Sequence, residues 1–434
     1  MSAKPETAPY RAAFDAMPAG EFDQRRRAAL AQFETLGFPT RRDEAWRFTD
    51  LKPLHGAGFP PHPNPLPGGE RVRAQRAGEG AVSRYALAGD THRIVIVNGR
   101  FVPELSRIGA LPTGALLLNT AALITAHPGV AQRLTDSTDF VGAQAFGSLN
   151  AALFSDGFVL ALDTGVQLDQ PIEIVYWGDT PERSLHLRNL ILLGAGSRAT
   201  LIESFAGEGH YWTNAVGIVD VGAGAALRHV KLQDEAAEAI HFGQARISLA
   251  HDAKYESFVL TLGGRLSRSD SFVTFAGENA ACGLFGAYLL RGEQEATNAT
   301  FVDHAAPRCT TNEVFKGVVD ERAHGVFLGR IAVRQDAQKT NANQLNKNLL
   351  LSPRANVDTK PELEILADDV KCSHGATVGD LDETALFYLA ARGIPAPEAR
   401  RMLIEAFAAD ALDRIDDLAL RAHLAAHVQR WLGQ

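Results

Sequence analysis

Cysteine is scarce in this sequence, which has only Cys282, Cys309 and Cys372 among its 434 residues. Three cysteines are too few for the disulfide framework that stabilises many small secreted domains. Free thiols are typical of a reducing compartment, where they remain available as metal ligands or nucleophiles. We therefore expect a cytoplasmic protein.

The sequence also lacks an excess of basic charge and any long apolar run. Its formal net charge is −8, whereas general nucleic-acid binding requires a basic surface, so nucleic acid is not an expected partner. No apolar run approaches the ~20 residues of a membrane span. Residues 1–20 have no continuous apolar stretch of the signal-peptide type. We expect no membrane association.

Several motifs that mark catalytic sites are missing as well. The chain has no G-x-x-x-x-G-K-[ST], and its glycine pairs lie in turns between strands, so they do not form a dinucleotide fingerprint. H-E-x-x-H, C-x-x-C and G-x-S-x-G are absent too. These absences argue against ATP hydrolysis by a P-loop and against the hydrolases that those motifs identify.

The most regular feature that is present is a series of short β-rich runs from Phe158 onward. Small turn residues recur about every 26–28 residues, a spacing typical of stacked repeats. No convincing helix interrupts the runs, which disfavours a doubly wound sheet. A β-sandwich and a solenoid both remain compatible with this pattern, and we favour a mainly β, parallel β-helix. The turns are Gly194–Gly196, Gly222–Gly224, His251–Ala253 and Gly277–Asn279.

Helical periodicity flanks these runs on both sides. Residues 10–36 and about 115–150 look mostly helical, with a strand and an Asn98-Gly99 hairpin turn between them. Three more helices are predicted within about 380–432. We therefore predict a mostly helical N-terminal region at 1–150, a β-helix core at 151–371 and a C-terminal helical domain at 372–434.

A segment rich in proline and glycine, at about 59–80, interrupts the N-terminal region. Prolines alternate with other residues from Pro61 to Pro67, and Gly68-Gly69 follows. Such a composition offers little apolar surface to offset the entropy of ordering. We predict a disordered insertion without chemistry, with a partner-binding proline tract as the alternative.

The densest set of reactive side chains lies in Asp368–Thr377. Residues i and i+2 of a strand point to the same face, so Cys372 and His374 could approach one metal ion. A thiolate and an imidazole suit iron, zinc or copper(I), and two ligands would leave the site open for a second chain or a cluster. The alternative is a buried cysteine beside a histidine that caps the following helix. His304 and Cys309 form a second candidate pair, for which core packing is the alternative.

Five stretches form distinctive sequence motifs: Arg42–Thr49, Lys360–Ile365, Asp368–Thr377, Leu386–Ile394 and Ile404–Phe407. Together they resemble the SufB/SufD family of iron–sulfur cluster assembly proteins. The likeness covers most of the chain apart from about 59–80, and the stretches follow the family's order. The sequence from Lys371 to Thr377 is similar to the corresponding motif in the SufD branch of the family.

The resemblance implies a right-handed parallel β-helix core between helical regions, and a non-enzymatic scaffold function in iron–sulfur cluster assembly. It implies a heterodimer with SufB through the β-helix cores and binding of the ATPase SufC by the C-terminal helices, to which we assign Met402, Glu405 and Phe407. A transient iron–sulfur cluster shared with SufB would form at the interface, with His374 and Cys372 as the metal-site residues of this chain. A flavin on the complex and a homodimer of the isolated chain stay open.

Two other functions fit a β-helix. A carbohydrate-active enzyme would need paired carboxylates in a groove along the coils, and Asp252, Asp270, Glu278 and Asp303 show no clear pairing. A structural solenoid without chemistry is the third interpretation. Co-purification distinguishes them, because a scaffold brings SufB and SufC whereas an enzyme comes alone and turns over polysaccharide.

Overall fold

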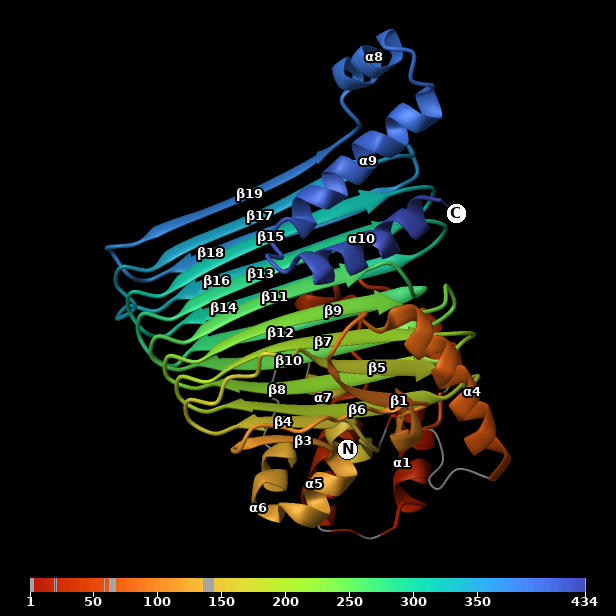
Figure 1. Ribbon diagram of the computed structural model, residues 1–434, viewed down its shortest axis with the longest axis vertical. Coiled ribbons are helices and arrows are strands. Elements are labelled where there is room, and N and C mark those ends of the chain that lie inside the picture. The colour runs from red at the N-terminus through yellow and green to blue at the C-terminus, as the bar shows by residue number, and fades with distance from the viewer. Residues whose placement is uncertain are drawn as a thin grey trace.

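The computed structural model describes residues 4–18, 20, 22–57, 59–61, 68–135 and 144–433. Its body is a parallel β-solenoid of two facing sheets, with helices contributed by both ends of the chain (Figure 1). From β6 onward each strand pairs in parallel with the strand two places earlier in the chain, as β10 does with β8 and β11 with β9. This pairing confirms the predicted β-helix and excludes the sandwich.

Each coil contributes one strand to each sheet. We call the ten-stranded sheet sheet B, with the order β19-β17-β15-β13-β11-β9-β7-β5-β1-β2, and the nine-stranded sheet sheet A, with the order β18-β16-β14-β12-β10-β8-β6-β4-β3. Sheet B contains β1 (His92–Val97), β2 (Arg100–Phe101), β5 (Ile172–Gly178), β7 (Arg198–Gly207), β9 (Ala226–Asp234), β11 (Lys254–Thr261), β13 (Ala281–Leu290), β15 (Thr310–Val319), β17 (Asn341–Leu350) and β19 (Lys371–Gly379). Sheet A contains β3 (Ala115–Asn119), β4 (Phe158–Leu162), β6 (Ser184–Leu193), β8 (Trp212–Val221), β10 (Ile240–Leu249), β12 (Leu266–Phe275), β14 (Glu295–His304), β16 (His324–Val333) and β18 (Asn356–Ile365).

The small-residue turns occupy equivalent positions in successive coils. Gly196, Gly224 and Asp252 all take left-handed backbone angles, with φ of 66°, 65° and 57°. The N–H of Gly196 donates to the carbonyl of Ala223, and the N–H of Gly224 donates to that of His251, each at 2.8 Å. The left-handed angle favours glycine and tolerates aspartate or asparagine, which is why these residues recur at the predicted spacing.

Alternate side chains along each strand point into the solenoid. Most are apolar and form one continuous core. A second set of inward side chains is polar and buried, and it is satisfied by contacts between coils. For example, His229 Nε2 lies 2.7 Å from Glu203 Oε1, and Gln344 Nε2 donates to Glu313 Oε2 at 3.0 Å. The interior of the solenoid therefore contains buried polar side chains that bond to one another between coils, in addition to its apolar core.

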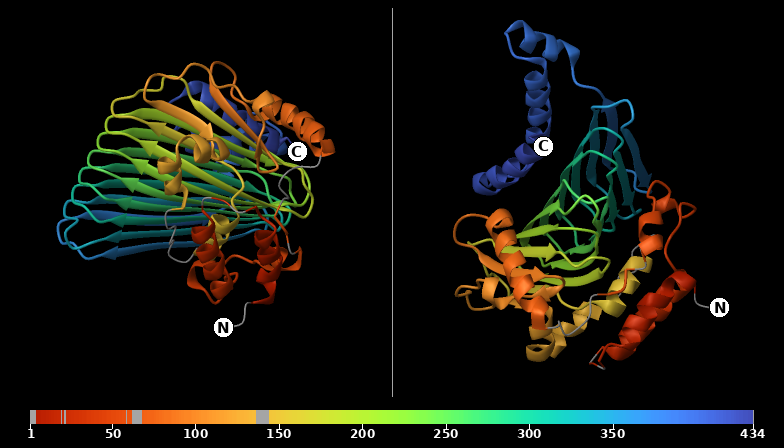
Figure 2. Two further views of the ribbon diagram at one scale, coloured as in Figure 1. Left: turned by 90° about the horizontal axis from the view of Figure 1, so that it is seen from below. Right: turned by 90° about the vertical axis from the view of Figure 1, so that its right-hand side faces the viewer.

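Helices cover the outer face of each sheet (Figure 2). On sheet A, the helical residues Phe33 and Phe146 form one apolar cluster with Trp212 of β8. On sheet B, α4 packs at the N-terminal end, and α9 and α10 pack further along. No helix among the described residues is long and apolar enough to cross a lipid bilayer. The helices are α1 (Ala8–Asp15), α2 (Asp23–Leu36), α3 (Lys52–Ala57), α4 (Gly68–Tyr85), α5 (Thr120–Ala126), α6 (Pro128–Ala131), α7 (Gln144–Leu153), α8 (Glu383–Ala391), α9 (Ala396–Leu412) and α10 (Leu418–Leu432).

The prediction of a disordered insertion at 59–80 is wrong for the part of it that the structure describes. Phe59 is fully buried, and α4 starts at Gly68. Ala81 and Tyr85, beyond the segment, anchor this helix on the outer face of sheet B, so residues C-terminal to the segment add burial that its own composition does not suggest. Residues 62–67, where prolines alternate, lie outside the described residues.

Two predicted boundaries also change. The mostly helical prediction for about 115–150 misses β3, which pairs antiparallel with β4 and extends sheet A. The β-helix continues past residue 371, because Lys371–Gly379 form β19 and pair in parallel with β17. The C-terminal helices start after this strand, and α8 is capped by Asp382, whose Oδ1 accepts from the Thr384 N–H at 2.8 Å.

Candidate functional site

The solenoid ends in an uncovered coil. β18 and β19 are the last strands of sheets A and B, and most of their residues are exposed or half-buried. Three large apolar side chains of this coil face solvent, namely Ile365, Leu366 and Val378, with 63% of Leu366 exposed. An edge strand presents unpaired N–H and C=O groups that can pair with another chain. We call this surface, made of β18, β19 and the turn between them, the open end.

Cys372 and His374 both lie on β19, as the i, i+2 spacing predicts. Their register partners on β17 are Ala342 and Gln344, both of which are buried. Cys372 is half-buried against the interior core, whereas His374 is exposed. Burial raises the pKa of the Cys372 thiol. Both side chains therefore lie on the interior-facing side of β19, at the mouth of the solenoid, and the helix-capping alternative for His374 is excluded because Asp382 caps α8.

Two polar layers lie directly behind His374. Register pairing places Gln344 of β17 beneath His374, and Glu313 of β15 beneath Gln344. Gln344 and Glu313 are fully buried. Thr300 Oγ1 donates to Glu313 Oε2 at 2.7 Å, across the interior from sheet A. Burial raises the pKa of Glu313 to about 7.

No group of three or more His, Cys, Asp and Glu side chains that could hold a metal ion exists among the described residues. The second sequence candidate, His304 with Cys309, is a packing element. His304 is fully buried and stacks on Phe275 with ring centroids 4.4 Å apart. Its Nε2 lies 2.8 Å from Thr311 Oγ1, and burial lowers its pKa to about 4. The sulfur of Cys309 instead faces the backbone carbonyls of Gly277 and Pro307.

The three residues predicted to bind a partner all lie on α9, but their surroundings differ. Met402 is exposed, and the Glu405 carboxylate accepts from Gln429 Nε2 of α10 at 3.1 Å. Phe407 is half-buried and packs toward β15, where the Lys316 ammonium lies 4.4 Å from its ring centroid. Phe407 therefore helps to hold α9 on sheet B.

A more prominent exposed surface lies on α8. This helix has no buried residue, and it extends away from the solenoid body at the top of Figure 1. Phe387 is 75% exposed and Tyr388 is 54% exposed, with the Arg392 guanidinium 4.3 Å from the Tyr388 ring centroid. Sequence reasoning missed this surface because Leu386 and Leu389 suggest an ordinary buried stripe. The signal available was Phe387-Tyr388 next to them, which gives α8 apolar residues on both faces.

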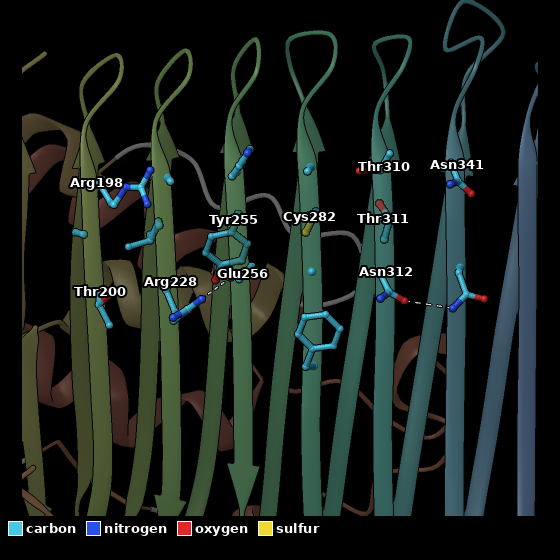
Figure 3. Close-up of a pocket in the computed structure, with 18 residues that line it drawn as sticks. Arg198, Thr200, Arg228, Tyr255, Glu256, Cys282, Thr310, Thr311, Asn312 and Asn341 are labelled. Atoms are coloured by element: carbon cyan, nitrogen blue, oxygen red, sulfur yellow. Dashed lines mark hydrogen bonds and ion pairs between the residues drawn. The ribbon is translucent and has the colours of Figure 1, made fainter. Parts of the chain in front are cut away.

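A groove of about 660 Å³ lies across the outer face of sheet B. Figure 3 shows its lining residues in rows across successive strands, with Arg198, Arg228 and Asn312 among them. Among the described residues that line it, Glu256 supplies the one carboxylate, and Arg228 Nη2 pairs with that carboxylate at 3.2 Å. Glycoside hydrolysis uses two carboxyl groups that flank the bond to be cleaved. The groove does not offer that arrangement.

Comparison with known proteins identifies the family. The model of the SufBD protein N-terminal region matches residues 10–174, and the model of the SufBD core domain of the SUF iron–sulfur cluster assembly system matches residues 176–407. The chain belongs to the SufBD family of iron–sulfur cluster assembly proteins. The two models together span the solenoid and most of the helices on its faces, whereas α10 lies beyond the matched residues.

Individual relatives agree with this assignment. The chain is 32% identical to an iron–sulfur cluster assembly SufBD family protein of Synechocystis over 92% of its length and 89% of the relative's. It is 32% identical to the iron–sulfur cluster assembly protein SufD of Escherichia coli, over 92% of this chain and 90% of that protein. It is 31% identical to the chloroplastic protein ABCI7 of Arabidopsis thaliana, over 90% and 82%. The predicted resemblance to SufD proteins is confirmed.

Proposed function

We propose that this SufBD protein is a cytoplasmic, SufD-type scaffold subunit that has no catalytic reaction of its own. It pairs with SufB through the open end and holds the ATPase SufC through its C-terminal helices. The nascent iron–sulfur cluster is cargo, and it forms where this chain meets SufB. The observation that carries the proposal is that Cys372 and His374 share the last, uncovered strand of the solenoid.

The open end has the properties of a pairing surface. Its strand edges offer backbone hydrogen-bonding groups, and Ile365, Leu366 and Val378 offer apolar area beside them. Strand addition to such an edge supplies main-chain hydrogen bonds, and exposed side chains supply specificity. SufB, which shares the fold family, is the partner we propose for this edge. In its absence the same edge would serve a homodimer.

The two candidate ligands at the open end, His374 and Cys372, suit transient binding of an iron–sulfur cluster that is later transferred. An imidazole provides a neutral nitrogen lone pair, and a thiolate is a soft ligand for iron. Burial favours the protonated form of Cys372 in the isolated chain, and metal binding must release that proton. We therefore assign His374 as the principal ligand, with Cys372 secondary and a SufB cysteine supplying the soft ligand. No flavin is assigned to this site.

For SufC we propose the exposed face of α8 together with Met402. Phe387 and Tyr388 are large aromatic residues that face solvent instead of packing in a core. Aromatic side chains of this kind anchor many protein–protein interfaces. Truncation after residue 380 would not test SufC binding alone, because α9 and α10 cover apolar residues of sheet B and their removal would expose these residues. Phe387→Ala should abolish SufC capture while the melting temperature stays unchanged, whereas Leu418→Ala, which removes an equally exposed side chain on α10, should retain SufC.

The decisive experiment for the cluster site replaces His374 by alanine. The His374 ring is exposed, so its removal should leave the chain soluble and bound to SufB and SufC. After anaerobic reconstitution, we expect iron and sulfide per complex to fall several-fold. Cys372→Ser should have a smaller effect.

His251→Ala is the matched control, because it removes another exposed imidazole, one that pairs with Asp252. Its cluster content should equal that of the unmodified complex. Full cluster content in the His374→Ala complex, with only a lowered melting temperature, would refute the ligand assignment.

A further inference from the structure

Gln344 lies one coil behind the open end, with its side chain extended across the interior. It is fully buried on β17. Its amide reaches sheet A at Gly329, where an added Cβ would collide with the amide nitrogen and carbon. Gly329 thus provides the space that this glutamine occupies. The side chain is held in one place by the walls of the solenoid.

Glu313 fixes which way the Gln344 amide faces. Gln344 Nε2 donates to Glu313 Oε2 at 3.0 Å, and the same oxygen accepts from Thr300 Oγ1 at 2.7 Å. Because Oε2 accepts from Thr300, it is an acceptor toward Gln344 as well, whether or not the other oxygen of Glu313 carries a proton, and it selects the NH2 end of the amide. The other end, Gln344 Oε1, is buried and has no hydrogen-bond partner among the residues that the structure describes. A buried carbonyl without a partner is unusual and calls for a donor.

The residue beside Gln344 in the next coil is His374. Gln344 and His374 are register partners on neighbouring parallel strands, so both side chains point to the same side of sheet B. Neighbouring strands lie about 4.8 Å apart, which is within reach of a hydrogen bond between stacked side chains. On sheet A, Thr300, Gly329 and Pro361 are register partners in successive strands. This order parallels that of Glu313, Gln344 and His374 on sheet B. Pro361 has no N–H to offer as a competing donor.

We propose that Gln344, held by Glu313, is the positioning residue for His374: a rotation of the exposed imidazole brings its N–H to Gln344 Oε1, the acceptor that has no partner within the described part of the chain. The hydrogen bond fixes one tautomer of the ring and leaves the lone pair of the other nitrogen free at the open end. Partners of this kind orient metal-binding histidines and strengthen them as ligands. The ligand role of His374 rests on the proposed function, whereas the hydrogen bond to Gln344 does not.

The test uses the full chain without iron, labelled with ¹⁵N-histidine. The tautomer of His374 is read from its ring nitrogen shifts, and the His374→Ala spectrum assigns the signal. In the unmodified chain we expect a single tautomer. In Gln344→Leu, which keeps the apolar volume but removes the acceptor, we expect the two-tautomer mixture of a free imidazole. An unchanged tautomer in this variant overturns the proposal.

Two further variants separate positioning from general damage to the interior. Asn346→Leu removes another buried amide of β17, one that donates to the Phe315 carbonyl at 3.2 Å; it should lower the melting temperature and leave the tautomer unchanged. The exchange variant Glu313→Gln/Gln344→Glu keeps one donor and one acceptor in contact and still presents an oxygen to His374. It should retain the single tautomer, and a mixture in this variant would count against the proposal.

Reconstitution of the complexes connects this result to the cluster. Gln344→Leu should lower iron affinity about 10–100-fold, the loss typical for removing such a partner, and the exchange variant should restore it. If His374→Ala keeps its cluster while the tautomer depends on Gln344, the ligand role fails and the positioning contact stands. If His374→Ala loses its cluster while Gln344→Leu keeps both tautomer and affinity, the positioning contact fails alone.

Discussion

Glu313 should make the stability of this protein fall as pH rises from about 4.5 to 7. Burial raises the pKa of this carboxyl from 4.5 to about 7 in the folded chain. Between these values the unfolded chain has released the proton and the folded chain still holds it, so each step up in pH favours unfolding. At about 1.4 kcal/mol per pH unit, the full loss is about 3 kcal/mol. Above pH 7 both states are ionised and the loss stops growing.

Glu313→Gln removes this titration and keeps a side chain that can bond to Thr300 and Gln344. The variant should therefore gain stability relative to the unmodified chain as pH rises, by about 3 kcal/mol between pH 4.5 and pH 8. The titratable group that faces Glu313 is Cys282, whose thiol has a pKa raised well above its ordinary value by burial, so it stays neutral in this range.

Urea unfolding of both chains at half-unit pH steps measures the difference. Glu256→Gln serves as the control, since it makes the same substitution at a side chain that is about half exposed. A constant difference between Glu313→Gln and the unmodified chain across the window would refute the reasoning.

Three other predictions concern how the chain is held together. Trp46→Ala should cost about 3–5 kcal/mol, because the buried indole lies 4.9 Å from the Phe146 ring and 3.9 Å from the Arg268 guanidinium; an unchanged urea midpoint would contradict its anchoring role. Gly224→Ala should cost about 1–2 kcal/mol because its φ is 65°, whereas Gly129→Ala, where an added Cβ meets nothing within 4 Å, should leave the melting temperature unchanged or raise it. Phe59→Ala should cost about 3–5 kcal/mol, because this ring is fully buried; no loss of thermal stability would restore the idea of a segment without a structural role.

The sequence predicts the repeat and the placement of the candidate site better than it predicts the flanks. The aligned turns at Gly196, Gly224 and Asp252 are local, because a left-handed residue must be small or able to hydrogen-bond to its own backbone. The shared face of Cys372 and His374 is local too, since it follows from strand geometry alone. These two inferences need no knowledge of distant contacts.

What the sequence could not predict depends on contacts between distant segments. β3 reads as part of a helical stretch, and it becomes a strand because β4 provides an edge for it. The helix at Gly68 is poor in apolar residues, and it is stabilised by packing on β1 and β5. The layer of Gln344 behind His374 is invisible in sequence, because the two residues are neighbours only once the coils have stacked. Each of these is a case in which tertiary context decides the local structure.

The open end has a thermodynamic consequence. In a stack of repeats each coil is stabilised mainly by its two neighbours, and the coil that contains β19 has a neighbour on one side only. Local opening should therefore need the least free energy at β19, and its amide hydrogens should exchange with solvent before those of β11 in the middle. The candidate ligands Cys372 and His374 thus lie on the coil that opens most easily. A partner that adds a strand there converts a terminal coil into an internal one, and the same event that completes the site also makes it rigid.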